Sequence, residues 1–309
     1  MSIAPATSPI THVRYVGMAV PDLSRATRFY EDTWGLQPVA GDSGIAFFGA
    51  GNPEQYILRL REDESKRAEV VGFGVATDGD VDELAVRLAT GGVRLAHEPR
   101  VLDTPGGGYG LRFFDPDGRC IEVSSNVAQR GFREVEPGEG RPRRLSHVVF
   151  NTPDINRLKT FYETALGFRL SDWLEDFMCF LRCQSDHHTV ALFQSPHASL
   201  NHVSFEMLGI DEFMRGTGNL MRRGHSPIWG PGRHGPGNNT FAYFLDPNAF
   251  VVEYTTMLDR VDEDRGWCPK VWRAIPEESD LWGTAGPLTK PAIDAMLNDP
   301  DTIWQAPPI

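Results

Sequence analysis

The stretch VVFNTPDINRLKTFYETALGF, from Val148 to Phe168, decides the fold because it repeats an earlier part of the chain. It aligns without gaps with VGMAVPDLSRATRFYEDTWGL, from Val16 to Leu36. Both copies run from an apolar strand through Pro-Asp into a helix that ends in Phe-Tyr-Glu, and then to a Gly followed by an apolar residue. Internal similarity of this kind predicts two halves with the same architecture.

The helix of the second copy has the periodicity of an amphipathic helix and suitable residues at both of its ends. We expect Thr152-Pro153 to cap it, with the proline in its first turn, and Gly167 to end it. The residues that recur on one face are apolar, as an amphipathic helix requires: Ile155, Leu158, Phe161, Tyr162, Ala165 and Leu166.

The two halves match again further along the chain. FFDPDGRCIEV (113–123) and YFLDPNAFVVEY (243–254) both read as a strand, an Asp-Pro turn and a strand that carries a Glu. Each half is also doubled internally, since LSHVVF (145–150) and LNHVSF (200–205) each begin a strand that a helical stretch follows. The sequence therefore predicts an α+β fold of four βαβββ modules, with two modules in each domain.

The boundaries follow from composition. QRGFREVEPGEGRPRR (129–144) is rich in charge, Pro and Gly, which is typical of a linker. We expect an N-terminal domain at 1–130, a linker at 131–144, a second domain at 145–258, and a tail at 259–309. Three roles stay open for the tail: a lid, a subunit contact, or packing of its aromatic side chains without a part in the chemistry.

Composition narrows the class of protein. The hydrophobic share of 40% and the charged share of 23% are typical of a soluble globular protein. The net charge of −12 repels phosphate backbones and argues against nucleic acid as a partner. No apolar run approaches the ~18 residues of a membrane span, and the N-terminus has no secretion-signal pattern. The four scattered cysteines form no CxxC pair, so we expect reduced thiols in a cytoplasmic protein.

Three residues in the second half could bind a metal. His147, His202 and Glu253 each lie in an apolar run with a strand pattern, at similar steps of 55 and 51 residues. Module repetition would bring such positions to one pocket. Two imidazoles and one carboxylate occupy one face of an octahedron and leave three positions open, as non-haem Fe(II) oxygen chemistry requires.

A lone histidine in an apolar strand is more often a hydrogen-bonded core residue than a ligand. The repeat supplies an internal comparison. In the first half, Tyr15 occupies the position of His147, and Glu122 occupies the position of Glu253. The position of His202 falls at about Gly72. The histidines are thus lost while the fold pattern is kept, which predicts a metal site in the second half alone and a structural role for Glu122.

These residues resemble the vicinal-oxygen-chelate superfamily, and the second half is similar to its type I extradiol dioxygenases, such as the homoprotocatechuate, dihydroxybiphenyl and catechol 2,3-dioxygenases. The resemblance covers both domains and implies paired βαβββ modules in open, barrel-like sheets. It implies that the metal ligands are His147, His202 and Glu253. It also implies catalytic positions at His188 in SDHHTVALF, and at His234 and Tyr243 in GRHGPGNNTFAYF.

The resemblance assigns a task to each of these side chains. His188 would stabilise and protonate the oxygen-derived anion and assist deprotonation, because a histidine titrates near neutral pH. Tyr243 would hydrogen-bond a substrate oxygen, and His234 would orient the substrate from the opposite side. Strand alternation would send His187 to the face opposite His188, so we expect a surface or structural role for it.

The expected reaction is therefore extradiol cleavage of a catechol by O2, with Fe(II) as cofactor and Mn(II) as the alternative ion, in aromatic catabolism. The resemblance also implies a homo-oligomer. Two other functions stay open on the same scaffold. One is a metal-dependent lyase or isomerase of the glyoxalase type, which would work without O2, and the other is a non-catalytic small-molecule-binding protein without a metal. The identity of the catechol stays open too.

Overall fold

A computed structural model describes residues 8–39, 41, 44–262 and 266–307. The first half forms two βαβββ modules, as the repeat predicts. Module one comprises β1 (Ile10–Val20), α1 (Leu23–Arg28) with the π-helical turn η1 (Phe29–Thr33), β2 (Gln37–Val39), β3 (Ile45–Gly49) and β4 (Leu58–Glu62). Module two comprises β5 (Arg67–Val75), α2 (Asp78–Thr90), β6 (Leu95–Val101), β7 (Tyr109–Phe114) and β8 (Cys120–Ser125).

The second half repeats the pattern. Module three comprises β9 (Arg144–Thr152), α3 (Ile155–Thr164), β10 (Arg169–Leu174), β11 (Met178–Arg182) and β12 (Val190–Gln194). Module four comprises β13 (Ser199–Glu206), α4 (Ile210–Arg222), β14 (Trp229–Arg233), the 3-10 turn η2 (Pro236–Asn238), β15 (Thr240–Leu245) and β16 (Val251–Thr256). β17 (Lys270–Trp272), α5 (Pro276–Ser279) and α6 (Lys290–Leu297) follow.

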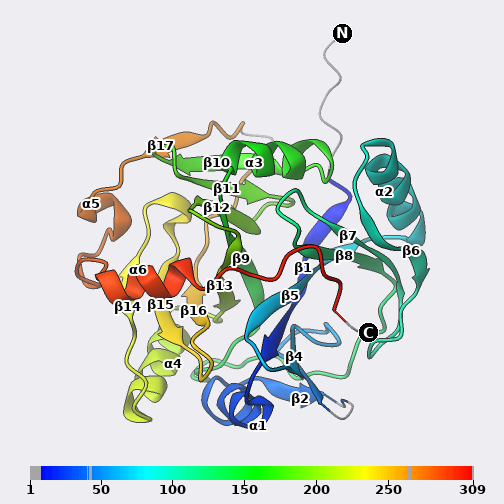
Figure 1. Cartoon of the computed structure of the whole chain (residues 1–309). Helices are drawn as coiled ribbons and strands as arrows, with labels where there is room; N and C mark the ends of the chain where they lie inside the picture. Colours follow the sequence, from blue (N-terminus) through cyan, green and yellow to red (C-terminus); the bar gives the residue numbers. More distant parts are fainter. Residues whose placement is uncertain (1–7, 40, 42–43, 263–265, 308–309) are drawn as a thin grey trace.

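Each half forms one open, twisted sheet (Figure 1). The strand order is β2-β3-β4-β1-β5-β8-β7-β6 in the first sheet and β14-β15-β16-β13-β9-β12-β11-β10-β17 in the second. The leading strands of paired modules, β1 with β5 and β9 with β13, run antiparallel at the centre of each sheet. Among the described residues neither sheet closes into a barrel, and the predicted α+β fold of paired modules is confirmed.

The start of α3 differs from the expected cap. Asp154 is the N-cap, because its side chain accepts a hydrogen bond from the backbone N–H of Arg157 at 3.0 Å. The predicted Thr152-Pro153 cap is therefore wrong by two residues, and the proline precedes the helix. Gly167 does follow the helix with a φ of 75°, in the left-handed region that favours glycine at a helix end.

The two halves share one apolar core, which contains central-strand residues of both sheets. Trp34, just after η1, lies against Tyr254 of β16 with ring centroids 3.9 Å apart. The hydroxyl of Tyr254 donates to the carbonyl oxygen of Trp34 at 2.6 Å. Across this contact the first half supports β16, the strand that carries Glu253.

The tail joins both halves rather than standing apart from them. β17 pairs in parallel with β10, at the edge of the second sheet. After α6 the chain runs across to the first half (red in Figure 1), where the backbone N–H of Trp304 donates to the carbonyl oxygen of Gly118 at 2.7 Å. The division into domains at 1–130 and 145–258 stays a prediction.

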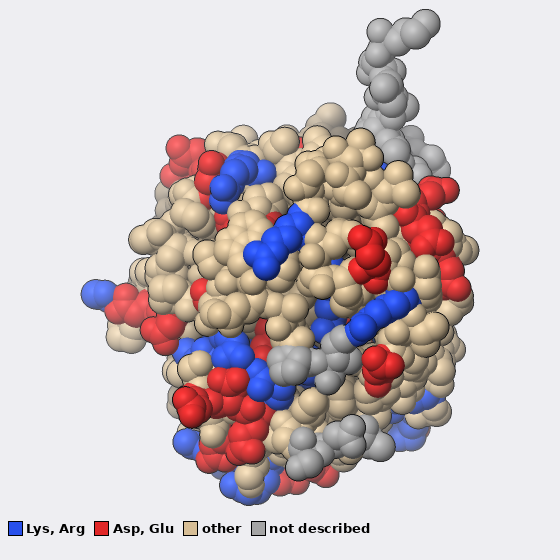
Figure 2. Space-filling view, turned by 45° about the vertical axis from the view of Figure 1, so that its right-hand side comes forward, with Lys and Arg blue, Asp and Glu red and all other residues tan. Residues whose placement is uncertain are grey.

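The surface carries charge of both signs. On the face shown in Figure 2, groups of acidic side chains lie near Lys and Arg side chains, and uncharged residues fill most of the area between them. Across the described residues, no helix combines the length and the apolar character that crossing a membrane demands.

Candidate metal centre

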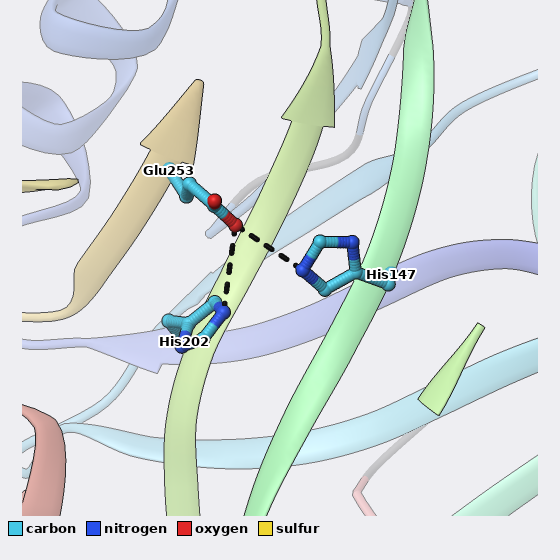
Figure 3. Close-up of side chains that lie close together, drawn as sticks. All are labelled: His147, His202 and Glu253. Carbon is cyan, nitrogen blue, oxygen red and sulfur yellow. Dashed lines mark ion pairs between the residues drawn. The ribbon is translucent and has the colours of Figure 1, made fainter. Parts of the chain in front are cut away.

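The three predicted ligands lie on three adjacent strands in the middle of the second sheet (Figure 3). His147 of β9 pairs with Ser204 of β13, and Ser204 pairs with Glu253 of β16. His202 lies two residues before Ser204 and therefore shares its face, because side chains alternate along a strand. The sheet register thus directs all three side chains to one side.

The ligand atoms of the three residues lie within 4.8 Å of one another. Nε2 of His147 is 3.2 Å from Oε2 of Glu253, and Nε2 of His202 is 3.5 Å from the same oxygen. All three residues are buried. Neither oxygen of Glu253, nor Nε2 of His202, has a hydrogen-bond partner among the described residues, although a buried polar atom normally has one. A divalent cation between them would supply the missing partner, so the residues fit a metal ion.

The outer nitrogens of both histidines have partners of their own. Nδ1 of His202 is 2.7 Å from Oδ1 of Asn201, whose amide group donates to Asn151, so Nδ1 of His202 carries the proton. Nδ1 of His147 is 3.0 Å from the hydroxyl of Ser146. These contacts leave Nε2 of each histidine for a metal, as outer partners of metal-binding histidines generally do. Sequence reasoning missed Ser146 and Asn201, although each directly precedes its histidine.

The electrostatics of the cluster suit a cation. Burial raises the pKa of Glu253, but the nearby imidazoles of His147 and His202 outweigh burial and hold that pKa below its usual range. Burial lowers the pKa of His202. A carboxylate and neutral imidazoles are the protonation states in which these groups bind metal.

His188 lies beside the cluster, with its ring centroid 4.3 Å from that of His147. Burial lowers the pKa of His188 well below its usual value, and the charge of His147 adds to the shift. The expected placement of His187 on the face opposite His188 is wrong, and so is the surface alternative for its role, whereas the structural alternative fits its burial. His187 is fully buried and its Nδ1 is 3.0 Å from Nδ1 of His188. Both residues precede β12, which begins at Val190, so strand alternation does not govern them.

His234, which directly follows β14, and Tyr243 of β15 form a hydrogen-bonded pair. Nδ1 of His234 donates to the carbonyl oxygen of Ser279 at 3.1 Å, so its Nε2 accepts from the hydroxyl of Tyr243 at 2.9 Å. The Tyr243 ring also lies 5.0 Å from that of His202, centroid to centroid. Burial lowers the pKa of His234 to about 4 and raises the pKa of Tyr243 well above its usual value.

These side chains line one cavity of about 440 Å³. Its polar lining includes His147, His188, His202, His234 and Tyr243. Eleven lining residues come from the tail, for which a lid was one of the predicted roles, and most of them are apolar or small: Ala274, Ile275, Pro276, Ser279, Asp280, Gly286, Pro287, Leu288, Ile293, Met296 and Leu297. The tail therefore forms a wall of the cavity.

The first half has no such centre among its described residues. The register aligns Tyr15 with Gly72, and Gly72 with Glu122, so Gly72 corresponds to Ser204. The position of His202 is therefore taken by Val70, and the correspondence with Gly72 inferred from sequence is off by two residues. Nε of Arg112 donates to Glu122 at 2.8 Å, so this Glu is in a buried ion pair and its structural role is confirmed.

Comparison with known proteins gives a consistent result. A model of the Glyoxalase/Bleomycin resistance protein/Dioxygenase superfamily matches residues 10–123 and 144–254. The chain is 32% identical to metapyrocatechase 2 of Cupriavidus necator, over 86% of this chain and 88% of that protein. It is 25% identical to a biphenyl-2,3-diol 1,2-dioxygenase of Paraburkholderia xenovorans, over 89% of this chain and 95% of that protein.

Two solved structures share the architecture. A Mn(II)-bound glyoxalase from Novosphingobium aromaticivorans superposes with a TM-score of 0.90 and 43% identity, over 97% of this chain and 98% of that one. An extradiol ring-cleaving dioxygenase from B. fuscum superposes with a TM-score of 0.82 and 25% identity, over 92% and 82%. The chain therefore belongs to the Glyoxalase/Bleomycin resistance protein/Dioxygenase superfamily, and within it to the extradiol ring-cleavage dioxygenases.

Proposed function

We propose that this chain is an Fe(II)-dependent extradiol dioxygenase that opens the ring of a catechol beside its two hydroxyl groups. Both atoms of O2 enter the semialdehyde-type product, so the reaction needs no external reductant. The observation that carries the proposal is the shared cavity: His147 and His202, the two imidazole ligands, line it together with His188, His234 and Tyr243. A substrate held there would meet the metal and the acid–base groups at once.

His147, His202 and Glu253 would hold the ion and leave half of its coordination sphere open. When bound, the ion would lower the pKa of a catechol hydroxyl and supply a redox-active centre for O2. We propose Fe(II), with Mn(II) as the alternative. One relative of the chain is a manganese-dependent 2,3-dihydroxybiphenyl 1,2-dioxygenase, and one structural neighbour is Mn(II)-bound, so this scaffold accommodates Mn(II) in other proteins.

The remaining polar groups would move and hold protons. His188 would accept a proton from a catechol hydroxyl and return it to the oxygen-derived anion, because burial keeps its imidazole neutral in the resting protein. Tyr243 would hydrogen-bond a catechol oxygen, and His234 would orient the substrate from the side of β14. The apolar tail residues would exclude water from the cavity.

The cavity also argues for an uncharged ring substituent. Its walls include the side chains of Leu174, Phe177, Met178 and Phe193, and no Lys or Arg appears among the described lining residues. A carboxylate on the substrate would therefore lose its hydration without gaining a cationic partner. We propose a catechol with an alkyl or aryl substituent. We further propose that the enzyme acts in aromatic catabolism, in the cytoplasm, as a homo-oligomer and without nucleic-acid or membrane partners.

A glyoxalase-type lyase is the second candidate, because a structure that is 43% identical over nearly the whole chain is described as a glyoxalase. Such an enzyme would use the ion as a Lewis acid only. It would therefore act without O2 and tolerate Zn²⁺ or Ni²⁺.

One experiment separates these functions. The protein is purified without oxygen, its metal content is measured, and O2 uptake is followed across substituted catechols while a yellow product is monitored. Iron-dependent uptake of one O2 per catechol supports the proposal. Turnover of a thiol–aldehyde adduct without O2 would support the lyase, and a metal-free protein that binds catechols unchanged would indicate a binding protein.

A further inference from the structure

We propose that Asp172 and His187 form a hydrogen-bond relay that fixes the tautomer of His188, with the proton on Nδ1 and a free lone pair on Nε2 toward the cavity. The inference rests on the proposed function, in which His188 handles the catechol proton. It makes His187 and Asp172 positioning residues, although neither lines the cavity.

The relay begins at Asp172 of β10, whose carboxylate is buried and surrounded by donors. Oδ1 accepts the backbone N–H of Lys270 at 2.8 Å, and Oδ2 accepts Nε1–H of Trp272 at 2.7 Å. Oδ2 is also 3.1 Å from Nε2 of His187. Burial raises the pKa of Asp172, but these donors outweigh it and hold the pKa below its usual range. Asp172 is thus an acceptor at every contact, and Nε2 of His187 must carry a proton.

The proton position on His187 determines the proton position on His188. Its second ring nitrogen, Nδ1, is 3.0 Å from Nδ1 of His188. Two N–H groups cannot face each other at this distance, so only one of the two Nδ1 atoms is protonated. When neutral His187 holds its proton on Nε2, its Nδ1 is an acceptor, and the donor is Nδ1–H of His188. The nitrogen of His188 that remains for a ligand in the cavity is then the unprotonated Nε2.

His187 is held in the orientation that this requires. Its side chain is fully buried, and its backbone N–H donates to the carbonyl oxygen of Asp259 at 2.8 Å. The rings of Phe180 and Trp267 lie 5.8 and 5.6 Å from its ring, centroid to centroid. The His187 and His188 rings stand at 87° to each other. The imidazole therefore has little freedom to turn over and exchange its two nitrogens.

The relay serves the reaction in both protonation states of His188. Before proton transfer, it presents Nε2 of His188 as a base. After transfer, the imidazolium still donates Nδ1–H to His187, and the negative charge of Asp172 stabilises it through the second ring, as a buried carboxylate does for a catalytic histidine in other hydrogen-bonded triads. Because Lys270 and Trp272 belong to β17, the tail also anchors the acid–base histidine.

The first test measures the tautomer directly and needs neither metal nor catechol. Long-range ¹H–¹⁵N correlation spectra of the metal-free, ¹⁵N-histidine-labelled protein at pH 7.5 distinguish protonated from unprotonated ring nitrogens, and the His188→Asn variant identifies the His188 signals. We expect a protonated Nδ1 and an unprotonated Nε2. A proton on Nε2 of His188 would overturn the relay, whatever reaction the enzyme catalyses.

Two variants of His187 then test its consequence. His187→Gln keeps an acceptor toward His188 and a donor toward Asp172, whereas His187→Leu keeps similar bulk without either. In the iron-loaded enzyme we expect His187→Leu to lower kcat by about 100-fold or more while KM for the catechol and the iron content stay within about threefold, and His187→Gln to stay within about tenfold of wild type. We also expect mixed His188 tautomers in the Leu variant.

Equal kcat values for the Leu and Gln variants would contradict the relay, as would an unchanged His188 tautomer in the Leu variant. If the Leu variant does not fold, the wild-type spectrum still decides. Absence of O2 uptake by every form, with the expected tautomer present, would remove the proposed function and leave the relay standing.

Discussion

The ring of Tyr15 lies over Gly72 on the neighbouring strand, so closely that a Cβ atom on residue 72 would collide with it. At the corresponding register of the second half, His147 faces Ser204. One aromatic ring in the first half thus fills the space that the second half leaves for a metal centre. Buried side chains that include Phe47, Tyr56 and Val70 complete the filling.

Gly72→Ala should therefore destabilise the protein without touching its metal centre. Overpacking of this kind usually costs about 1–3 kcal/mol, because neither the Tyr15 ring nor the strand can move freely. Urea unfolding of the variant checks the loss, with iron content as the control. An unchanged free energy of unfolding would show that Tyr15 has another position available.

His188→Ala should leave iron bound and impair turnover. Positioned acid–base groups contribute about 10²- to 10⁴-fold, so we expect kcat to fall within that range while iron per chain stays that of wild type. Steady-state O2 uptake and elemental analysis measure the two quantities. Loss of iron together with activity would instead make His188 part of the ligand set.

Substrate charge should matter more than substrate size. We expect kcat/KM for an alkyl- or arylcatechol to exceed that for a carboxylate-bearing catechol by about tenfold or more, because the described lining residues include no Lys or Arg. Leu288→Arg adds a cation to the cavity wall that the tail forms. This variant should reduce the ratio of the two kcat/KM values. Val86→Arg, on an exposed site of α2, is the matched control and should leave the ratio as it is. A wild-type preference for the acid would refute the proposed substrate class.

Asp246 should make stability depend on pH. It lies in the Asp-Pro turn before β16, and burial raises its pKa to about 6. The carboxyl group of Asp246 therefore binds its proton more tightly in the folded protein than in the unfolded chain. This tighter proton binding stabilises the folded protein in acid, and the stabilisation is lost as the pH rises through about 6. Asp246→Asn cannot ionise.

The free energy of unfolding of Asp246→Asn, relative to wild type, should therefore increase by about 2–3 kcal/mol between pH 4 and pH 8. Urea unfolding of both proteins across this range gives the difference. A difference that does not vary with pH would place the pKa of Asp246 at its ordinary value.

The sequence was sufficient for the modules and for the residues that lie on regular strands. His147, His202 and Glu253 could be identified because each sits in a periodic strand of a repeated unit, and strand alternation then directs them to one face. The correspondence of His202 with Gly72 was a misalignment by two residues, since the step of 132 residues that aligns Val16 with Val148 takes His202 to Val70, as the strand pairing does.

The parts of the site outside regular strands were less accessible. The placement of His187 failed because the segment before β12 follows no strand periodicity, so alternation gave the wrong face. Asp172 carries no sequence signal, since its partners Lys270 and Trp272 lie about a hundred residues away. The cavity wall made by the tail depends on how α5 and α6 fold back over the second sheet, which is a matter of long-range packing.

The proposed chemistry depends most on one metal ion held by three strands of the second sheet. Iron per chain in the anaerobically purified wild type, Glu253→Ala and Glu122→Gln proteins tests it most directly. We expect one iron in the wild type, one in Glu122→Gln, whose position is equivalent in the first half, and none in Glu253→Ala, which should also lose O2 uptake with catechols. Full iron content or full O2 uptake by Glu253→Ala would contradict the account.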